Sequence, residues 1–255
     1  MTNTFNIITL GCKVNQYESE AVEELFIKKG YEKVSANADI YVINTCTVTN
    51  MSDRKSRQMI SRARRDNPNA VVAVMGCYSQ VKPEEVASIE GVDIVLGSRN
   101  KENVVEHCED ILQNKEAIDK IIAPSESKTF EELQISNQTE MTRAYLKIQD
   151  GCNMYCSYCL IPYARGNIVS RDIESIVEES KRLANNNFKE IVLTGIHVSS
   201  YGKDIDDELS LIDVIEAVAE VEGIERIRLS SMEPRHISLE FLERMKATKK
   251  ACDHF

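Results

Sequence analysis

The sequence predicts an α/β protein built on parallel sheets, because short strands rich in β-branched residues alternate with helical segments along the chain. One strand, residues 70–75, is almost wholly apolar, which is typical of burial on both faces of a parallel sheet. In the first half we expect strands at 5–10, 39–44, 70–75, 92–96 and 120–123, and helices at 19–29, 53–65, 100–113 and after Pro83. Residues 11–16 are predicted to form a turn, and Asp53 to cap the second helix.

The pattern resumes after a polar stretch. Residues 124–141 carry no clear period and are predicted to be a linker between domains at 1–123 and 142–255. The second domain has expected strands at 143–149, 190–194 and 225–229, and expected helices at 173–185, 209–221 and 239–246. Three strands do not close a barrel, so we expect a partial (βα) barrel whose third strand has an unpaired edge.

Composition excludes some classes of protein. No apolar run reaches the ~18 residues that span a membrane, and the first residues lack the basic and apolar regions of a signal peptide. Eight cysteines, standing in cluster spacing or just after strands, favour a reducing compartment, so we expect a cytoplasmic protein. The net charge of −10 argues against a surface that is basic throughout, although a local basic patch remains compatible with it.

Three cysteines in the second half are spaced C-x3-C-x2-C, at Cys152, Cys156 and Cys159. Thiolates packed this tightly suit an iron–sulfur cluster or zinc. Structural zinc prefers a fourth ligand close by, whereas the next histidine is His197 and the next cysteine is Cys252. A cluster held by three thiolates keeps one iron open for a substrate or cofactor. The alternative is a group of reduced structural thiols.

Three more cysteines, Cys12, Cys46 and Cys77, each lie just past the end of a different predicted strand. Parallel sheets bind ligands beyond the carboxyl ends of their strands, so these thiols are expected to meet at one edge and hold a metal or cluster. The alternative for each is a small buried hydrophobe, which is how we interpret Cys108 and Cys252.

The spacing of the second cysteine set, with Tyr158 before its last member, resembles the cluster motif of radical S-adenosylmethionine enzymes. Taken whole, the chain resembles their methylthiotransferase branch. The motifs that carry the resemblance, besides the C-x3-C-x2-C set, are Gly11-Cys12, Asn44-Thr45-Cys46, Gly76-Cys77, Pro162-Tyr163-Ala164-Arg165-Gly166, Leu193-Thr194-Gly195-Ile196-His197 and Ser230-Ser231-Met232-Glu233-Pro234.

The resemblance implies a flavodoxin-like N-terminal domain, a radical domain and two [4Fe-4S] clusters. Cys152, Cys156 and Cys159 would hold the catalytic cluster, whose open iron binds S-adenosylmethionine, which is then cleaved to a radical. Cys12, Cys46 and Cys77 would hold the second cluster, which carries the sulfur to be inserted. Tyr158 belongs to the cofactor motif. Gly195 and Glu233 follow strands, where Gly195 would let backbone approach the cofactor and Glu233 would bind its polar end; an ordinary loop glycine and a solvated carboxylate are the alternatives.

Two motifs indicate a substrate. Residues 11–16 (GCKVNQ) and 45–49 (TCTVT) resemble the branch that adds a methylthio group at C2 of N6-threonylcarbamoyladenosine 37, in the anticodon loop of tRNA. Sister branches act on isopentenyladenosine in tRNA or on a ribosomal protein, and a non-catalytic iron–sulfur electron-transfer module is a further alternative. Expected partners are tRNA, an electron donor such as a flavodoxin or ferredoxin, and a sulfur donor of unspecified kind. The family continues past residue 255 with more barrel strands and an RNA-binding barrel, so the chain resembles an N-terminal fragment.

Two groups of arginines have open roles. Arg165 and Arg171 flank the loop after the second cysteine set and would bind cofactor carboxylate or tRNA phosphate, or simply be solvated. The predicted helix at 53–65 has a basic half that is either a solvated face or a contact for the tRNA backbone. Its basic residues are Arg54, Lys55, Arg57, Arg62, Arg64 and Arg65.

Overall fold

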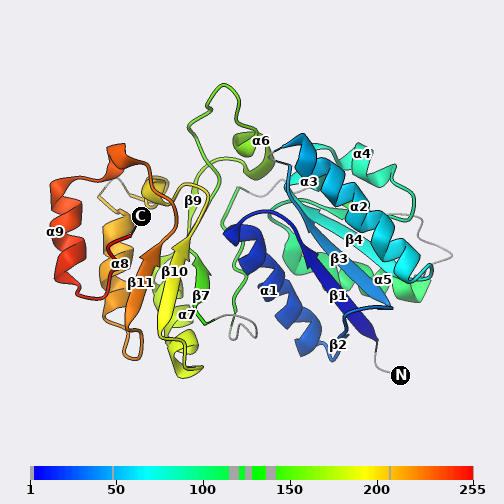
Figure 1. The fold of residues 1–255 in the computed structure, drawn as a ribbon, viewed down its shortest axis with the longest axis horizontal. Helices are drawn as coiled ribbons and strands as arrows, with labels where there is room; N and C mark the ends of the chain where they lie inside the picture. Colours follow the sequence, from blue (N-terminus) through cyan, green and yellow to red (C-terminus); the bar gives the residue numbers. More distant parts are fainter. Residues whose placement is uncertain are drawn as a thin grey trace. The chain divides into compact units, whose positions relative to one another are not determined.

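A computed structural model describes residues 3–47, 49–114, 121–123, 128–135, 142–206 and 208–254. It divides into two compact units (Figure 1). The N-terminal unit comprises Met1–Ser127 with Tyr155–Arg165, and the C-terminal unit comprises Lys128–Met154 with Gly166–Phe255. The division differs from a simple split at the predicted linker, because eleven residues of the second half join the N-terminal unit and part of the linker joins the other.

The N-terminal unit is built on a six-stranded sheet in which every neighbouring pair is parallel, which confirms the α/β class. Its strands are β1 (Thr4–Thr9), β2 (Glu32–Lys33), β3 (Ile40–Thr45), β4 (Val71–Gly76), β5 (Ile94–Leu96) and β6 (Ile121–Ala123). The order β2-β1-β3-β4-β5-β6 follows the flavodoxin-like pattern, with its switch point between β1 and β3.

Helices cover both faces of this sheet, because successive residues of the buried strands point to opposite sides. The helices are α1 (Lys13–Lys28), α2 (Asn50–Asp66), α3 (Cys77–Val81), α4 (Pro83–Ala87) and α5 (Val104–Asn114), with a 3₁₀ turn, η1, at Lys101–Asn103. On one face α1 and α5 pack on Val42 and Ala73, and Phe26 stacks on Phe5 at 4.8 Å between ring centroids. On the other face α2, α3 and α4 pack on Ile43 and Val74.

The C-terminal unit has a smaller parallel sheet in the order β11-β10-β7. Its elements are β7 (Ala144–Lys147), β8 (Gln149–Asp150), β9 (Val169–Ser170), α7 (Ile173–Asn185), β10 (Glu190–Thr194), η2 (Val198–Ser200), α8 (Leu211–Ala219), β11 (Arg226–Leu229), η3 (Pro234–His236) and α9 (Leu239–Ala247). The α6 helix (Ile161–Arg165) belongs to the N-terminal unit. The edge of β11 that we expected to be unpaired makes one parallel bridge, between Ile227 and Ala251.

The middle of the predicted linker is packed rather than free. Leu133 and Ile135 are buried in the C-terminal unit, and the Ile135 amide donates to Glu179 of α7 at 3.1 Å. Apolar side chains at 130, 133 and 135 therefore anchor residues 128–135. The remainder of the linker, 124–127 and 136–141, lies outside the described residues.

Two helix starts differ from those predicted. The α1 helix begins at Lys13 with Cys12 as its N-cap, so most of the expected turn at 11–16 is helical. The α2 helix begins at Asn50, where the N-cap is Thr49 and its hydroxyl accepts from the Ser52 amide. Asp53 instead lies buried in the first turn and accepts from the Thr47 hydroxyl at 2.7 Å. Within the described residues, no helix is both long and apolar enough to cross a membrane.

Candidate functional site

The three N-terminal cysteines lie at the carboxyl ends of three adjacent strands. Cys12 follows β1, Cys46 follows β3, and Cys77 opens α3 directly after β4. These strands are neighbours and parallel, so the three loops leave the sheet at the same edge, two of them at the switch point. The structure therefore brings the loops that carry these cysteines to one edge of the sheet, and their joint binding of a metal or cluster stays a prediction.

The cysteine loops are packed so closely that two glycines are needed. A Cβ added at Gly11 would lie 2.9 Å from Cys46 Cβ and 3.3 Å from its Sγ. A Cβ at Gly76 would lie 2.6 Å from both Asn44 Oδ1 and the Thr45 carbonyl oxygen. Both glycines also have positive φ, 108° and 102°. The loop after β1 thus contacts the loop after β3, and the end of β4 contacts the end of β3.

Buried amide and hydroxyl groups fix the loop geometry. The Asn15 side chain donates to the carbonyl oxygens of Leu10, at 2.7 Å, and Thr45, at 2.9 Å, and so ties the end of β1 to the end of β3. The Thr45 hydroxyl donates to the Met75 carbonyl at 2.7 Å and ties β3 to β4. Asn44 donates to the Asn15 carbonyl at 2.9 Å. This framework fixes the backbone of the loops that carry the thiols.

The three thiols differ in accessibility. Cys77 is buried, Cys46 is half-buried and Cys12 is exposed. Burial raises the pKa of the Cys77 thiol, while Arg165 opposes the rise through its charge and a hydrogen bond and Glu18 adds to it. One buried and two accessible soft ligands at a common edge fit a cluster that is anchored on one side and open on the other.

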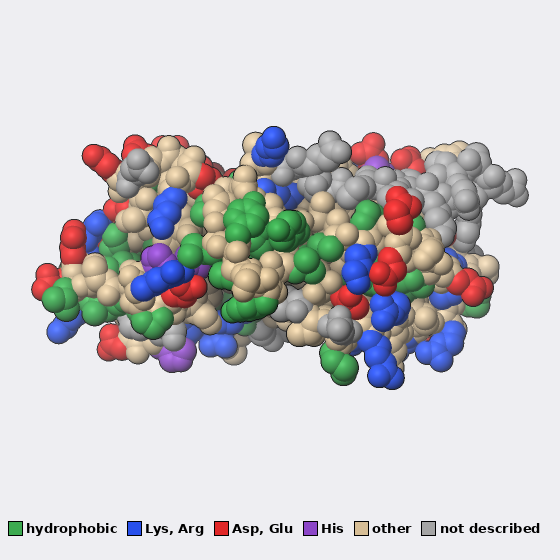
Figure 2. Space-filling view, turned by 90° about the horizontal axis from the view of Figure 1, so that it is seen from above, with side chains coloured by type: hydrophobic (Ala, Val, Ile, Leu, Met, Phe, Trp, Pro, Cys, Tyr) green, Lys and Arg blue, Asp and Glu red, His purple; other side chains and the backbone are tan. Residues whose placement is uncertain are grey.

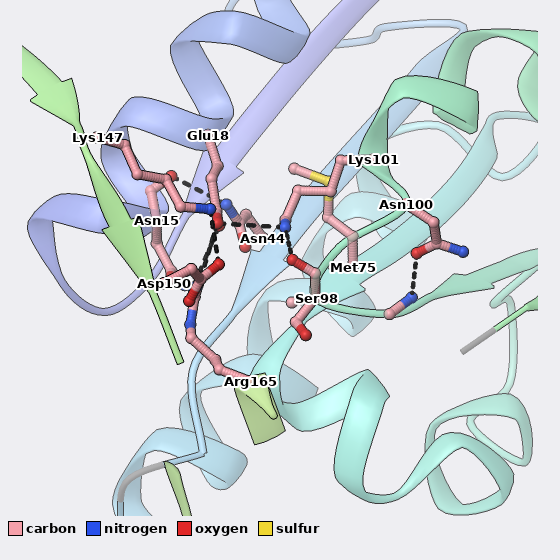
Figure 3. A network of polar contacts seen from close by, with 12 residues as sticks. Asn15, Glu18, Asn44, Met75, Ser98, Asn100, Lys101, Lys147, Asp150 and Arg165 are labelled. Carbon is pink, nitrogen blue, oxygen red and sulfur yellow. Dashed lines mark hydrogen bonds and ion pairs between the residues drawn. The ribbon is translucent and has the colours of Figure 1, made fainter. Parts of the chain in front are cut away.

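A buried charge network lies beside these cysteines (Figure 3). Glu18 of α1 accepts from Arg165 of α6 at 2.7 Å and faces Lys101 of η1 at 3.3 Å, and all three side chains are fully buried. The second Arg165 nitrogen, Nη2, donates to Asn15 Oδ1 at 2.7 Å, and the Cys12 thiol donates to the same oxygen over 3.6 Å. Arg165 is therefore neither solvated nor available to a phosphate, contrary to the roles considered from the sequence.

The C-x3-C-x2-C segment is divided between the two units. Cys152 belongs to the C-terminal unit, where its amide donates to the Gly166 carbonyl at 3.0 Å. Cys156 and Cys159 belong to the N-terminal unit, as do Cys12, Cys46 and Cys77. Cys156 is exposed and Cys159 half-buried, so both sulfurs are accessible to a ligand. Tyr158 between them is 93% exposed, which leaves its ring free to contact a bound molecule.

Polar side chains gather at the strand ends of the C-terminal unit. The ligand atoms of His197, Glu233 and His236 lie within 4.8 Å of one another, after β10 and β11. Burial lowers the pKa of both imidazoles, with Lys203 and Arg235 adding to the effect. The Arg235 guanidinium lies 2.6 Å from the Glu233 carboxylate. The lowered pKa values favour neutral imidazoles, and the Glu233 carboxylate is already paired with Arg235.

Gly195 has a structural explanation of its own. A Cβ there would lie 2.9 Å from the Gln149 carbonyl and 2.9 Å from its side-chain oxygen, and that side-chain oxygen accepts from the His197 amide at 2.8 Å. The glycine therefore permits close packing of β8 against the loop after β10. Its contact with a cofactor stays a prediction.

Several of the other arginines singled out in the sequence form ion pairs and hydrogen bonds within the fold. Arg171 is fully buried and pairs with Glu179 at 2.5 Å and Glu132 at 3.1 Å. On α2, Arg57 bonds to Tyr78 and Glu85, and Arg64 bonds to three backbone carbonyls and Asp93. The exposed basic residues of α2 are Arg54, Lys55, Arg57, Arg62 and Arg65, of which Arg57 is paired as described. On the face in Figure 2 basic side chains lie beside acidic ones rather than forming one large area of single charge.

Sequence reasoning missed Glu18 and Lys101. Glu18 follows Val14 and precedes Val22 at four-residue spacing, so it lies on the apolar stripe of α1. A carboxylate on such a stripe requires a buried cation, and this signal was present in the sequence. Lys101 carried no comparable signal, because it sits in a short 3₁₀ turn.

Two family descriptions match the chain. "Uncharacterized protein family UPF0004" matches residues 4–97, and "Radical SAM superfamily" matches residues 146–255. Two solved structures share the fold, at 12–13% sequence identity, and this likeness concerns the fold alone. The cobalamin-dependent S-adenosylmethionine radical enzyme OxsB has a TM-score of 0.61, and the match covers 98% of this chain and 43% of the OxsB chain. The radical S-adenosylmethionine methyltransferase TsrM from Kitasatospora setae has a TM-score of 0.58, with 97% and 65% covered.

Curated relatives align along almost the whole chain. "Threonylcarbamoyladenosine tRNA methylthiotransferase MtaB" is 44% identical in Bacillus subtilis, over 96% of this chain and 55% of the relative, and 42% identical in Aquifex aeolicus, over 97% and 60%. A "tRNA-2-methylthio-N(6)-dimethylallyladenosine synthase" of Pelotomaculum thermopropionicum is 34% identical, over 98% and 58%. The chain thus spans between half and two thirds of the length of these relatives. Its two matched regions and these relatives show that the chain belongs to the radical S-adenosylmethionine methylthiotransferase family.

Proposed function

We propose that this chain acts in radical-based methylthiolation of tRNA, with C2 of N6-threonylcarbamoyladenosine 37 in the anticodon loop as the position modified. The observation that carries the proposal is the presence of two cysteine sets, one of which meets at the edge of a flavodoxin-like sheet. Two relatives named for this nucleoside are 44% and 42% identical, against 34% for a relative named for the dimethylallyl nucleoside. The difference favours the threonylcarbamoyl substrate.

Membership of the radical superfamily implies one [4Fe-4S] cluster and S-adenosylmethionine. We assign the cluster to Cys152, Cys156 and Cys159, where the cofactor would supply the radical that an unactivated aromatic C–H requires. The exposed ring of Tyr158 is available to a bound cofactor. Glu233, with His197 and His236 beside it, offers polar groups to the cofactor, and Gly195 keeps the loop close to the strand ends.

We assign a second [4Fe-4S] cluster to Cys12, Cys46 and Cys77. Its support is the donor set: three soft thiols on adjacent loops, two of them accessible, held by a framework of buried hydrogen bonds. These residues would bind the iron and leave one side open for the sulfur that is inserted. The corresponding domains are 1–123 for the cluster-binding sheet and 142–255 for the radical core, with 124–141 between them.

Three further partners follow from this chemistry. Reductive cleavage of S-adenosylmethionine needs an electron donor, such as a flavodoxin or ferredoxin, and the inserted sulfur needs a donor. A tRNA substrate and reduced thiols indicate the cytoplasm. The exposed basic residues of α2, such as Arg54 and Arg62, are available to the RNA backbone.

The test begins with iron stoichiometry in the anaerobically reconstituted chain. Two cubanes require about eight irons per chain, and alanine at either cysteine set should halve this content. Replacing Cys152, Cys156 and Cys159 should abolish reductive cleavage of S-adenosylmethionine, whereas replacing Cys12, Cys46 and Cys77 should leave it detectable. Failure of the reduced, iron-loaded chain to cleave the cofactor would favour a non-catalytic electron-transfer module.

The substrate is tested by mass spectrometry of tRNA nucleosides from a strain that lacks the full gene. We expect loss of the methylthio group from N6-threonylcarbamoyladenosine, with the dimethylallyl nucleoside unchanged. Loss from the dimethylallyl nucleoside, or from a ribosomal protein instead, would assign the chain to a sister branch.

A further inference from the structure

Arg165 joins the segment that follows the second cysteine set to the first one. It ends α6, six residues after Cys159, and α6 packs against α3, whose first residue is Cys77. Its guanidinium forms a bidentate pair with Glu18, at 2.7 Å to Oε1 and 3.2 Å to Oε2. All of these residues belong to the N-terminal unit. An arginine this fully buried is held in one orientation (Figure 3).

The same guanidinium reaches two of the three candidate ligands. Through its charge and a hydrogen bond it opposes the rise that burial causes in the pKa of the Cys77 thiol. It also donates to Asn15 Oδ1 at 2.7 Å, the oxygen that accepts from the Cys12 thiol. Groups that hydrogen-bond metal ligands orient those ligands and tune the metal they hold.

Arg165 and Lys101 both pair with the Glu18 carboxylate, and all three side chains lie away from water. A charge acts strongly on its neighbours in such a low-dielectric setting. Reduction potentials of iron–sulfur clusters depend on net charge and on hydrogen bonds to the sulfurs.

We propose that Arg165, held by Glu18, is a positioning residue of the N-terminal cluster whose charge and hydrogen bond at Cys77 raise the reduction potential of that cluster. The inference rests on the assignment of Cys12, Cys46 and Cys77 as cluster ligands proposed above. One electron added to the cluster that these thiolates would hold increases the negative charge that Arg165 faces, so the guanidinium favours the reduced state. Glu18 has the opposite sign and opposes reduction.

The test isolates the N-terminal cluster in a parent chain with Cys152→Ala, Cys156→Ala and Cys159→Ala. This 255-residue parent is reconstituted anaerobically, its iron is counted, and the reduced cluster is followed by electron paramagnetic resonance. Dithionite supplies the electron through redox mediators. In this parent Arg165→Gln should lower the ratio of reduced to oxidised cluster about tenfold at a fixed potential, which for one electron is a shift of about 59 mV. Lys101 then still neutralises Glu18.

The sign of a second variant separates electrostatics from structure. Glu18→Gln removes a negative charge and should shift the potential upward, opposite to Arg165→Gln. Arg165→Lys keeps the charge and should lie nearer to the parent than Arg165→Gln does. The matched control is Arg171→Gln, because Arg171 is an equally buried, carboxylate-paired arginine of the C-terminal unit and should leave the potential unchanged.

The outcomes distinguish this inference from the function on which it rests. A folded parent that binds no iron would refute the cluster assignment and this proposal together. A parent that holds about four irons, with Arg165→Gln and Glu18→Gln shifted the same way or not at all, would refute the role of Arg165 alone. If Arg165→Gln does not fold, an unshifted potential in Glu18→Gln refutes it equally.

Discussion

Replacing Gly76 by alanine tests how tightly the cysteine loops are packed. Gly76 stands between β4 and Cys77 with φ of 102° and ψ of −155°, a combination that is essentially restricted to glycine. The added methyl carbon would lie 2.6 Å from the Thr45 carbonyl oxygen and 2.6 Å from Asn44 Oδ1. The first atom is backbone, so it cannot move away without disturbing β3.

The cost has two parts. A non-glycine residue in such a conformation costs about 1–3 kcal/mol. Overpacking against a rigid neighbour adds about 1–3 kcal/mol. We therefore expect Gly76→Ala to lower the local free energy of opening by about 2–6 kcal/mol, which corresponds to amide exchange about thirtyfold faster or more.

The assay is hydrogen exchange of the amides of β3 and β4, compared with those of α1. The matched control is Gly30→Ala, because Gly30 also has positive φ, 86°, yet an added Cβ meets nothing within 4 Å. Only the backbone cost of about 1–2 kcal/mol applies there. If Gly76→Ala accelerates exchange of β3 and β4 no more than Gly30→Ala accelerates exchange at the end of α1, the packing argument is wrong.

Three further outcomes are expected. Arg64→Ala should lower the free energy of unfolding of the N-terminal unit in urea by about 2–4 kcal/mol, because several carbonyls and a carboxylate lose their hydrogen-bond donor. Arg62→Ala, at an exposed position, should change this free energy by less than about 0.5 kcal/mol, and equal effects of the two substitutions would contradict the prediction. In the iron-free chain, iodoacetamide should label exposed Cys12 quickly and leave Cys108 unlabelled, because burial raises the pKa of that thiol; similar rates would refute the burial. Burial raises the pKa of Glu190, but hydrogen bonds from two arginines of β11 outweigh this effect, so the pKa of Glu190 is lowered. The stabilisation that ionised Glu190 contributes is therefore present above the ordinary glutamate pKa, about 4.3, and is lost as pH falls through the lowered pKa. Glu190→Gln should be less stable than the parent at pH 7, and the difference should shrink toward pH 2.

The elements that the sequence predicts well are those with a strong apolar period. The helix at 173–185 has the predicted bounds because Asp172 caps it with two amide hydrogen bonds and Ile176 and Leu183 lie on one face. By contrast, α3 is five residues long and too short for a helical period to be detected. The start of α1 was missed because its N-cap is a cysteine, which is not a preferred capping residue.

The candidate site was predictable as far as topology determines it. Parallel strands bring their carboxyl ends to one edge, so the position of the loops of Cys12, Cys46 and Cys77 at that edge followed from strand order alone. The pairing of Arg165 with Glu18 did not, because residues almost 150 positions apart are joined by tertiary packing that no local period records. The role of basic residues on a helix is likewise ambiguous in the sequence, since Arg64 is hydrogen-bonded within the fold whereas Arg62 is exposed.

The spacing of the three N-terminal cysteines has a consequence for how the chain unfolds. Consecutive members are separated by roughly thirty residues, so a metal centre that joins them would close two long loops. Cross-links of this length restrict the unfolded chain and stabilise the folded state by roughly 3–4 kcal/mol per loop in the chain-entropy picture. Iron bound by these three thiols would therefore cross-link the loops that carry them, and loss of the iron in air would loosen the sheet edge that binds it.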